Sequence, residues 1–490
     1  MRTIGALLLL LPLAGLPAVA FASGTPATAP VAAKPPASAA GPTSVLRPRT
    51  VAPLPGGLDG VPMVNDNNPE LIRSAGILLS TFAGSGQVDP SAHLNQPLSG
   101  RFDLFSHHVY AGRPESLNST MWLALVGRPR GERPVRLQLL AGSTALSQSP
   151  DGREPAAPFL PLPTLMPQGA STTPVWSGPG SRVATELLQR QRGAGLPSAW
   201  TLEPGRITPL LELSLPVRGL DPLLNGRNLQ LQLQSDGPLD LALLAAPADG
   251  DRPPATTVWR QLLEGGLSPK EHAPTPKGAP GGMVYSRVSG VQTGSTWRGR
   301  LAAPGSPELP VSRAPISWPI ASLERGTLGT AQVQTAPLAA FYPGTAWAAH
   351  GNYGVTYDLV LPLVNDTGRP AALALSFESP LKHDRPLGGL RFAVAPSRAV
   401  TFRGTVEVSG LDGPQGRPLG RQAFHLVLRA GQEGPPLGQV RLAAGERRSL
   451  RVRLIYPADA TPPQVLSLLP LAPAAGGAVK QSGAPPSAAP

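Results

Sequence analysis

Alternating apolar residues between positions 354 and 377 constrain the fold of this chain more than any other feature. Every second residue from Val355 to Leu363 is apolar or aromatic, and the same alternation runs from Leu373 to Phe377. A period of two is typical of strands with one buried face. The connection NDTGRP at 365–370 is rich in residues that favour turns. The stretch therefore predicts a β-hairpin.

Proline and glycine constrain the rest of the chain in the same direction. The 490 residues include 62 Pro and 55 Gly, which interrupt helices and favour turns. Strand-like alternation recurs in both halves of the chain. We expect an all-β protein with two immunoglobulin-like β-sandwich domains, a few short helices and disordered ends that are rich in Pro and Ala.

Similar landmarks in the two halves indicate an internal duplication. The apolar segments 121–125 and 135–139 flank GRPRGERP, and 229–233 and 239–243 flank SDGP, so each set predicts a hairpin. Pro134 matches Pro370 and Gly205 matches Gly445 at nearly the same offset. We expect a first sandwich with its N-terminal lead-in at 49–250, a Pro-rich connector at 251–281 and a second sandwich at 282–472.

The two ends of the sequence carry their own signals. Arg2 precedes an apolar run, and Ala20 and Ala22 fit a cleavage site, so residues 1–22 predict a secretory signal peptide. Residues 23–48 and 473–490 are expected to be a disordered linker and a disordered tail. No other stretch is apolar enough to cross a membrane. We expect the mature chain, with no transmembrane segment, in the periplasm, in the outer envelope or outside the cell.

Short local patterns predict further elements. A helix is expected at 181–193, where Ser181 can cap its start, and another at 257–264, before two glycines. The segments 283–291 and 295–301 predict a strand pair, and 76–82 predicts a single strand.

Polar clusters offer only weak metal sites. The cluster NDNN at 65–68 has oxygen ligands but lacks the spacing of a calcium loop, so a turn is the favoured interpretation. His107 and His108 would point to opposite faces of a strand, so a metal site would need one of them together with His93 and Asp103. Without a ligand-spacing motif we predict no metal and no cofactor.

The positive charge of the chain is spread out. The net charge is +12, but the arginines are dispersed and no nucleic-acid-binding module accompanies them, so we expect no nucleic-acid partner. Arg451 and Arg453 share the outer face of a predicted strand and could contact an anionic polysaccharide. A solvated sheet face is the ordinary explanation for this pattern.

Long phrases of the sequence resemble one protein family. They are RGTLGTAQVQTAPLAAFYPGTAWAAHGNYGVTYDLVLPLVNDT at 325–367, PGGLDGVPMVNDNNPE at 55–70 and YPADATPPQVL at 456–466. They are similar to an exported cyanobacterial family known as domain of unknown function 3370, over roughly residues 49–468. The resemblance implies a cell-envelope or secreted location and supplies no catalytic residues.

Catalytic motifs are absent from the sequence. It contains no cysteine, no GxSxG, no HExxH and no P-loop. A glycosidase needs only two carboxylates across a cleft, but acids such as Asp358 and Glu378 lie in strand patterns, where they commonly face solvent. We expect a protein without enzymatic activity; the alternative is a periplasmic or secreted hydrolase that acts on glycans.

The loop before the 354–377 stretch is the best binding candidate. It holds Trp347, His350, Asn352 and Tyr353 among several glycines, and aromatic faces with a polar group suit stacking on sugar rings. In the alternative interpretation, Trp347 and Tyr353 fill the core where the chain crosses between sheets. We expect a binding or structural role, with an envelope polysaccharide or an envelope protein as the partner; a purely structural spacer is the third possibility.

Overall fold

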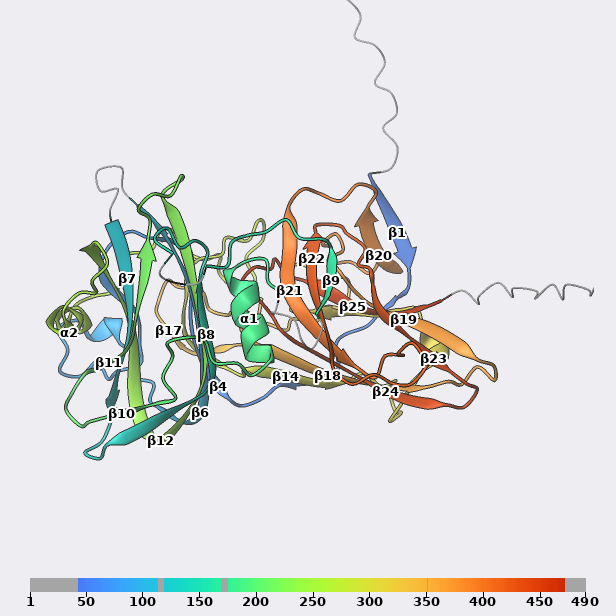
Figure 1. Cartoon of the computed structure of the whole chain (residues 1–490), viewed down its shortest axis with the longest axis horizontal. Helices are drawn as coiled ribbons and strands as arrows, with labels where there is room; N and C mark the ends of the chain where they lie inside the picture. Colours follow the sequence, from blue (N-terminus) through green and yellow to red (C-terminus); the bar gives the residue numbers. More distant parts are fainter. Residues whose placement is uncertain are drawn as a thin grey trace, which may run out of the picture. The chain divides into compact units, whose positions relative to one another are not determined.

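Strands are the dominant elements of the described residues, which contain only two short α-helices, so the predicted all-β class is confirmed. The computed structural model describes residues 43–112, 119–152, 154, 156–168, 175–349 and 351–471 (Figure 1). By their contacts, the described residues form one compact unit. The predicted signal peptide at 1–22, the predicted tail at 473–490 and most of the predicted linker lie outside the described residues.

Ten strands form the first large sheet, in which β10, β8, β12, β6, β4, β13 and β17 are neighbours in that order and β5, β7 and β11 complete it. These strands are β4 (Pro62–Ile72), β5 (Gly76–Ser80), β6 (Leu98–Ala111), β7 (Ser119–Pro129), β8 (Val135–Leu146), β10 (Ala199–Leu202), β11 (Thr208–Pro216), β12 (Leu224–Asp249), β13 (Val288–Thr293) and β17 (Leu338–Phe341).

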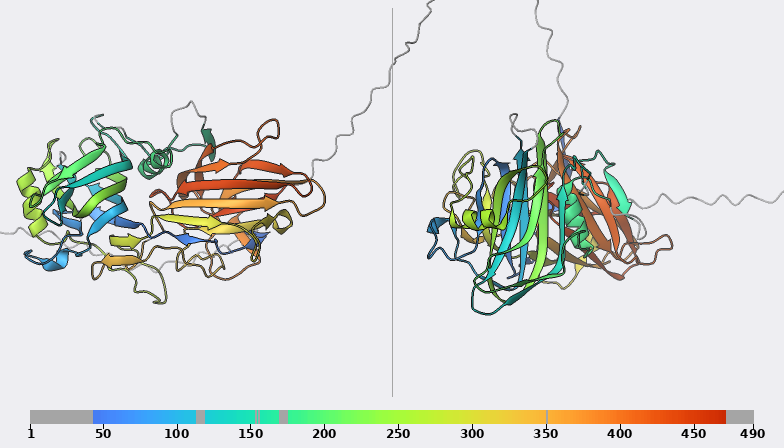
Figure 2. Two further views of the ribbon diagram at one scale, coloured as in Figure 1. Left: turned by 90° about the horizontal axis from the view of Figure 1, so that it is seen from below. Right: turned by 60° about the vertical axis from the view of Figure 1, so that its left-hand side comes forward.

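Two further sheets share a second core. The eight-stranded sheet comprises β3 (Gly57–Leu58), β9 (Leu165–Gln168), β14 (Thr296–Arg300), β15 (Leu309–Pro310), β18 (Thr356–Val364), β21 (Val400–Ser409), β22 (Gln422–Arg429) and β24 (Arg447–Ile455). The five-stranded sheet comprises β2 (Thr50–Val51), β16 (Ile316–Ile320), β19 (Ala371–Glu378), β23 (Pro436–Leu442) and β25 (Gln464–Pro470). Apolar residues from both sheets form one buried cluster, which is how the layers of a β-sandwich pack. The orange and red strands of this region run side by side in Figure 2.

Small elements complete the fold. They are a two-stranded sheet of β1 (Ser44–Pro48) and β20 (Gly389–Ala393), the helices α1 (Pro179–Leu188) and α2 (Thr256–Glu264), and the 3-10 turns η1 (Pro90–Ala92) and η2 (Val311–Arg313). The strand predicted at 76–82 and both predicted helices are therefore present, with shifted ends. Residues 44–48, the end of the segment expected to be a linker, form a strand because they pair with β20.

The hairpin predicted at 354–377 is wrong. β18 pairs with β24 in the eight-stranded sheet, whereas β19 pairs with β23 and β25 in the five-stranded sheet. The alternating residues of both strands lie in the same buried cluster, so the strands face each other through side chains and not through backbone hydrogen bonds. The Asn365 side chain closes the connection by donating to the carbonyl oxygens of Arg369, Leu442 and Ala443.

The other predicted hairpins are also wrong. The strands β7 and β8 each pair with β12 and not with each other. The segments on either side of SDGP belong to β12 itself, a continuous strand whose register shifts between Ser235 and Leu239. β13 and β14, predicted as a pair, lie in different sheets.

The cluster NDNN at 65–68, expected to form a turn, lies within β4. Its polar side chains find buried partners on neighbouring strands, because Asn65 donates to Gln292 Oε1 at 2.7 Å and Asp66 Oδ2 lies 2.6 Å from His108 Nε2. Partners of this kind reduce the cost of burying polar groups in a sheet.

Strand pairing also bears on the predicted duplication and domain division, which both stay predictions. β7 pairs with β11, and β18 pairs with β24, which are the matching strand pairs in the two proposed copies. β13 lies beyond the predicted connector, yet it pairs with β4. In the same way β9, from the predicted first domain, pairs with β22.

Candidate functional site

The four predicted binding residues lie between β17 and β18, and the structure places them differently. Trp347 and Tyr353 line two neighbouring cavities. Asn352 is fully buried. His350 lies outside the described residues. We call the cavity that Tyr353 lines the tyrosine cavity and the one that Trp347 lines the tryptophan cavity.

Asn352 organises the loop from within. Its backbone is left-handed, with φ of 55°, a conformation that Asn tolerates better than most residues. Its side chain donates to the Gln334 carbonyl oxygen at 2.6 Å and to Tyr357 Oη at 3.0 Å, and it accepts from the Ala336 N–H at 2.8 Å. These bonds position the loop, and Asn352 lines neither of the two cavities.

The tyrosine cavity has a volume of about 210 Å³ and gathers residues from distant parts of the chain. Asn67 comes from β4 and His107 from β6, while the other residues come from loops. Its lining consists of Asn67, His107, Tyr285, Leu323, Tyr353, Lys382, Ala458, Thr461 and Pro462.

Tyr353 is both a wall of this cavity and a packing residue. Its ring is stacked on Phe105 with centroids 6.4 Å apart and lies 5.7 Å from the ring of Tyr456. Its hydroxyl donates to the Ala460 carbonyl oxygen at 2.9 Å. The hydroxyl is thus already bonded, and burial raises the pKa of Tyr353.

The tryptophan cavity is small, with a volume of about 30 Å³. Trp347 Nε1 donates to the Thr275 carbonyl oxygen at 3.3 Å, and Lys277 Nζ lies 5.5 Å from the centroid of the Trp347 ring. Tyr285 and Leu323 line this cavity as well as the tyrosine cavity. Tyr285 is 38% exposed, so an aromatic surface is open to solvent where the two cavities meet.

His107 supplies an uncharged polar group to the tyrosine cavity. Its Nδ1 lies 2.9 Å from Asn228 Oδ1, so a proton on Nδ1 can be donated to that oxygen while Nε2 is left as an acceptor. Burial, with a smaller effect of His108, lowers the pKa of His107 to about 4. The ring is therefore neutral at neutral pH. His108 faces the other side of β6, as predicted for neighbours on a strand, and is fully buried against Asp66.

Lys382 is the charged residue of the tyrosine cavity. It follows β19, and its side chain is exposed at the rim. Partial burial lowers the pKa of Lys382. Among the described residues, no carboxylate lies within 4.0 Å of its ammonium group.

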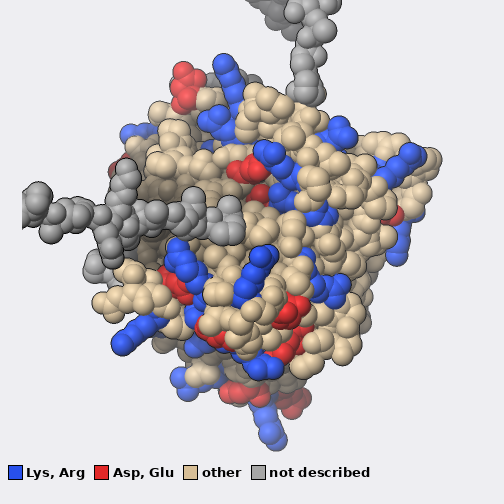
Figure 3. Space-filling view, turned by 90° about the vertical axis from the view of Figure 1, so that its right-hand side faces the viewer, with Lys and Arg blue, Asp and Glu red and all other residues tan. Residues whose placement is uncertain are grey.

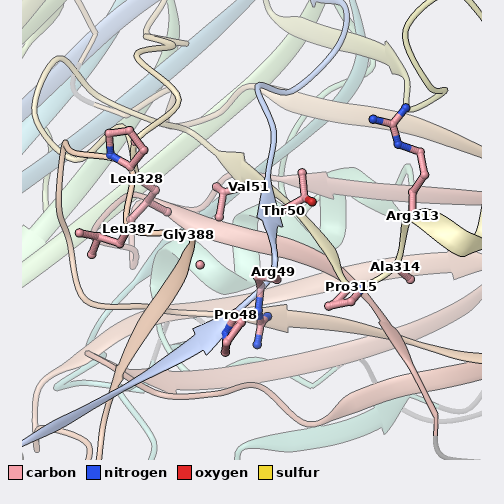
Figure 4. A pocket seen from close by; sticks show the side chains of 13 residues that line it. Pro48, Arg49, Thr50, Val51, Arg313, Ala314, Pro315, Leu328, Leu387 and Gly388 are labelled. Atoms are coloured by element: carbon pink, nitrogen blue, oxygen red, sulfur yellow. The ribbon is translucent and has the colours of Figure 1, made fainter.

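A larger pocket, of about 640 Å³, lies elsewhere (Figure 4). Arg49 and Arg313 line it from separate edges, with no aromatic side chain between them. Arg49 is already paired with Glu378 at 2.7 Å and lies over the Phe392 ring. Despite its size, this pocket therefore offers a ligand fewer free charged groups and no aromatic surface among its lining residues.

The residues considered for metal binding are engaged separately. His93 Nδ1 lies 2.8 Å from Ser80 Oγ, and Asp103 pairs with Arg101. Within the described ranges, no group of three His, Asp or Glu side chains could hold a metal ion.

Acidic and basic side chains neutralise one another on the outer face of the eight-stranded sheet. Asp358 accepts two hydrogen bonds from Arg451, at 2.7 and 2.6 Å, and Arg453 lies 3.5 Å from Glu407. On the face drawn in Figure 3, basic side chains are scattered among acidic and uncharged ones. The arginine face of β24 thus fits the solvated interpretation given above.

Sequence reasoning missed Tyr285, Lys382 and the role of His107. They lie far apart in the chain, and only the fold brings them together. A signal was present for Tyr285, an aromatic residue in a polar, Pro-rich region, whereas nothing in the sequence distinguishes Lys382.

Comparisons with known proteins place the chain in a family without giving it an activity. A family model described as a protein of unknown function matches residues 49–470. No curated protein matches the chain.

Proposed function

Because the chain belongs to the DUF3370 family of proteins of unknown function, we propose its role from the geometry of its own residues. The protein is an exported, non-enzymatic component of a cyanobacterial cell envelope, and it binds an envelope polysaccharide in the tyrosine cavity. One observation carries the proposal: Tyr285 is an exposed aromatic side chain that lines both cavities.

The lining of the tyrosine cavity supports a sugar ligand. A sugar ring has apolar C–H faces, which pack on aromatic and aliphatic side chains, and hydroxyl groups, which need polar partners. Tyr285 and Leu323 supply the first kind of surface, and Asn67, His107 and Thr461 supply the second.

The placement of the acids supports binding without hydrolysis. Glycosidases use two carboxyl groups on either side of the bond that is cleaved. Asp358 and Glu378 are engaged in ion pairs, and Glu324 is the one acid that lines either cavity in the part of the chain that the structure describes. A single carboxylate does not make such a pair.

Export is supported by the sequence alone. The apolar N-terminal run with its small-residue cleavage site is typical of a secretory signal, and the resemblance to an exported cyanobacterial family points to the same location. Among the helices that the structure describes, none is long and apolar enough to span a bilayer.

The test is binding of purified protein to polysaccharides extracted from a cyanobacterial envelope, measured by affinity electrophoresis and calorimetry. Tyr285→Ala and Trp347→Ala should each weaken binding about tenfold, since losing a central aromatic contact costs about 1.4 kcal/mol or more. Release of shorter glycans from the same polysaccharides would instead support the hydrolase alternative.

Phe159→Ala is the matched control, because Phe159 is 55% exposed and lines neither cavity. It should bind like the unaltered protein. Equal binding by the Tyr285, Trp347 and Phe159 variants would refute a site in these cavities, provided that all three unfold at the same temperature as the original chain.

A further inference from the structure

We propose that the tyrosine cavity selects a sugar that carries a carboxylate, a uronic acid unit, and that Lys382 binds that carboxylate. This inference rests on the proposed function and adds the class of sugar to it. Charge, size and the polar lining of the cavity each support it.

The charge of the cavity favours an anion. Among the described residues that line it, Lys382 is the one charged group, since His107 is neutral at neutral pH. The described residues place no carboxylate within ion-pair distance of Lys382. Lys382 is exposed at the rim, so its ammonium group is available to form a charge-assisted hydrogen bond with a ligand carboxylate.

The neighbouring charges reinforce this preference. Lys277 lies beside the Trp347 ring. At the Tyr285 hydroxyl, burial raises the pKa, the charge of Arg325 lowers it and the charge of Glu324 raises it. Glu324 is the one acid among the described residues that line the tryptophan cavity, and its Oε1 accepts a hydrogen bond from the Gly278 N–H at 3.2 Å. Among these charged residues, the cations Lys277, Arg325 and Lys382 outnumber the acid Glu324.

The size of the cavity restricts the ligand to about one ring. Its volume of about 210 Å³ is smaller than the ~300–1,000 Å³ of sites that enclose drug-sized molecules. The rest of a polymer would extend past Tyr285, which is exposed at the junction with the tryptophan cavity.

His107 fits the hydroxyl groups of the same ring. With Nδ1 bonded to Asn228, its Nε2 is free to accept a hydrogen bond from a sugar hydroxyl. The pKa of about 4 keeps this acceptor neutral over most of the pH range in which a uronate is ionised. The neutral Nε2 of His107 would thus bind a hydroxyl group of the sugar, while the cation Lys382 binds its carboxylate.

The experiment compares oligogalacturonate with the same oligomer as its neutral methyl ester, using calorimetry on the whole mature chain. We expect the acid to bind about tenfold more tightly than the ester, because a charge-assisted hydrogen bond is involved. Lys382→Gln should abolish this preference, because the acid loses its cationic partner, and Lys382→Arg should retain it. Raising the salt concentration should weaken binding of the acid and leave binding of the ester unchanged.

Two controls separate this inference from its competitors. Arg398→Gln removes an exposed charge that lines neither cavity and should change nothing. Oligo-aspartate of equal charge should bind more weakly than oligogalacturonate; tighter binding of the peptide would overturn the assignment to a sugar.

The outcomes also separate this inference from the proposed function. If acid and ester bind equally well, and Tyr285→Ala weakens both, polysaccharide binding stands and the carboxylate preference is wrong. If the acid preference survives in Lys382→Gln, the role of Lys382 is wrong. If neither oligomer nor any envelope polysaccharide binds, both proposals fail.

Discussion

At the scale of single residues, burial fixes the protonation state of His425. This side chain on β22 is fully buried, with Nε2 2.8 Å from Ser177 Oγ and Nδ1 3.2 Å from Thr405 Oγ1. Burial, helped by the charge of Arg403, lowers the pKa of His425 to about 4. The native protein therefore holds a neutral ring, whereas the unfolded chain protonates near the ordinary value of 6.5.

This difference predicts a pH-dependent contribution to stability. Because the folded pKa is the lower one, the contribution of His425 is fully present above about pH 6.5 and is lost as the pH falls toward about 4. The free-energy cost of His425→Gln, from urea unfolding, should therefore be about 2 kcal/mol smaller near pH 5 than near pH 7.

The comparison between variant and original chain is essential. Burial raises the pKa of Asp459 to about 7, which gives stability the opposite dependence on pH. Both chains contain Asp459, so subtracting the free energy of unfolding of the variant from that of the original chain at each pH removes its effect. His272→Gln, at an exposed position, should show no such change with pH. A cost of His425→Gln that is equal at both pH values would contradict the prediction.

At the scale of elements, alternation identifies a strand but not its partner. The apolar face of β18 has the same period whether the next strand lies beside it in one sheet or opposite it in another. The sequence therefore predicted the strands around 354–377 and the wrong pairing between them. β12 shows the same limit, because the turn-forming residues SDGP lie at a shift of register and do not end the strand.

Engineered cross-links can test the observed pairing, because the chain has no cysteine of its own. Val360 and Arg451 are cross-strand partners in β18 and β24, and such partners are within the ~4.4–6.8 Å that a disulfide spans between Cα atoms. Val360→Cys combined with Arg451→Cys should form a disulfide in nearly all molecules, measured by thiol titration and mass spectrometry.

Val364→Cys combined with Ala371→Cys is the matched control. A hairpin across 365–370 would place these two residues opposite each other, but in the structure Val364 pairs with Arg447 and Ala371 pairs with Leu442. This pair should keep free thiols. Rapid oxidation of the control pair, with free thiols in the first pair, would restore the hairpin.

The candidate site was predictable only in part, for the same physical reason. Trp347 and Tyr353 were identified because aromatic residues among glycines are visible locally. Tyr285, His107 and Lys382 join them through the fold, and no local pattern reports on contacts across such distances. Asn352, also visible in the sequence, has its hydrogen-bonding groups committed to the loop itself.

At the scale of the whole molecule, contacts cross the predicted domain boundary at several points. The Gln230 side chain donates to the Gly354 carbonyl oxygen at 2.7 Å, and the Ser181 N–H of α1 donates to Asp459 Oδ2 at 2.6 Å. Three short strands near the start of the described chain, β1, β2 and β3, pair with β20, β16 and β14.

These contacts predict that the halves depend on each other. A fragment of residues 282–472, produced alone, should melt about 10 °C or more below the whole chain, because it leaves the edges of several strands without partners. Scanning calorimetry of the 282–472 fragment, of a 49–250 fragment and of the whole chain would measure their melting temperatures. Two fragments that each melt at the temperature of the whole chain would instead support independent domains.

The position of β25 has a consequence for how the protein folds. β25, the last strand in the described part of the chain, lies between β16 and β19, in the middle of the five-stranded sheet. The centre of that sheet is therefore synthesised after its other four strands, and β2 pairs with a strand hundreds of residues later in the sequence. Such a high contact order slows folding. If the protein is exported as we propose, slow folding leaves time for the new chain to pass through a translocation channel before it folds.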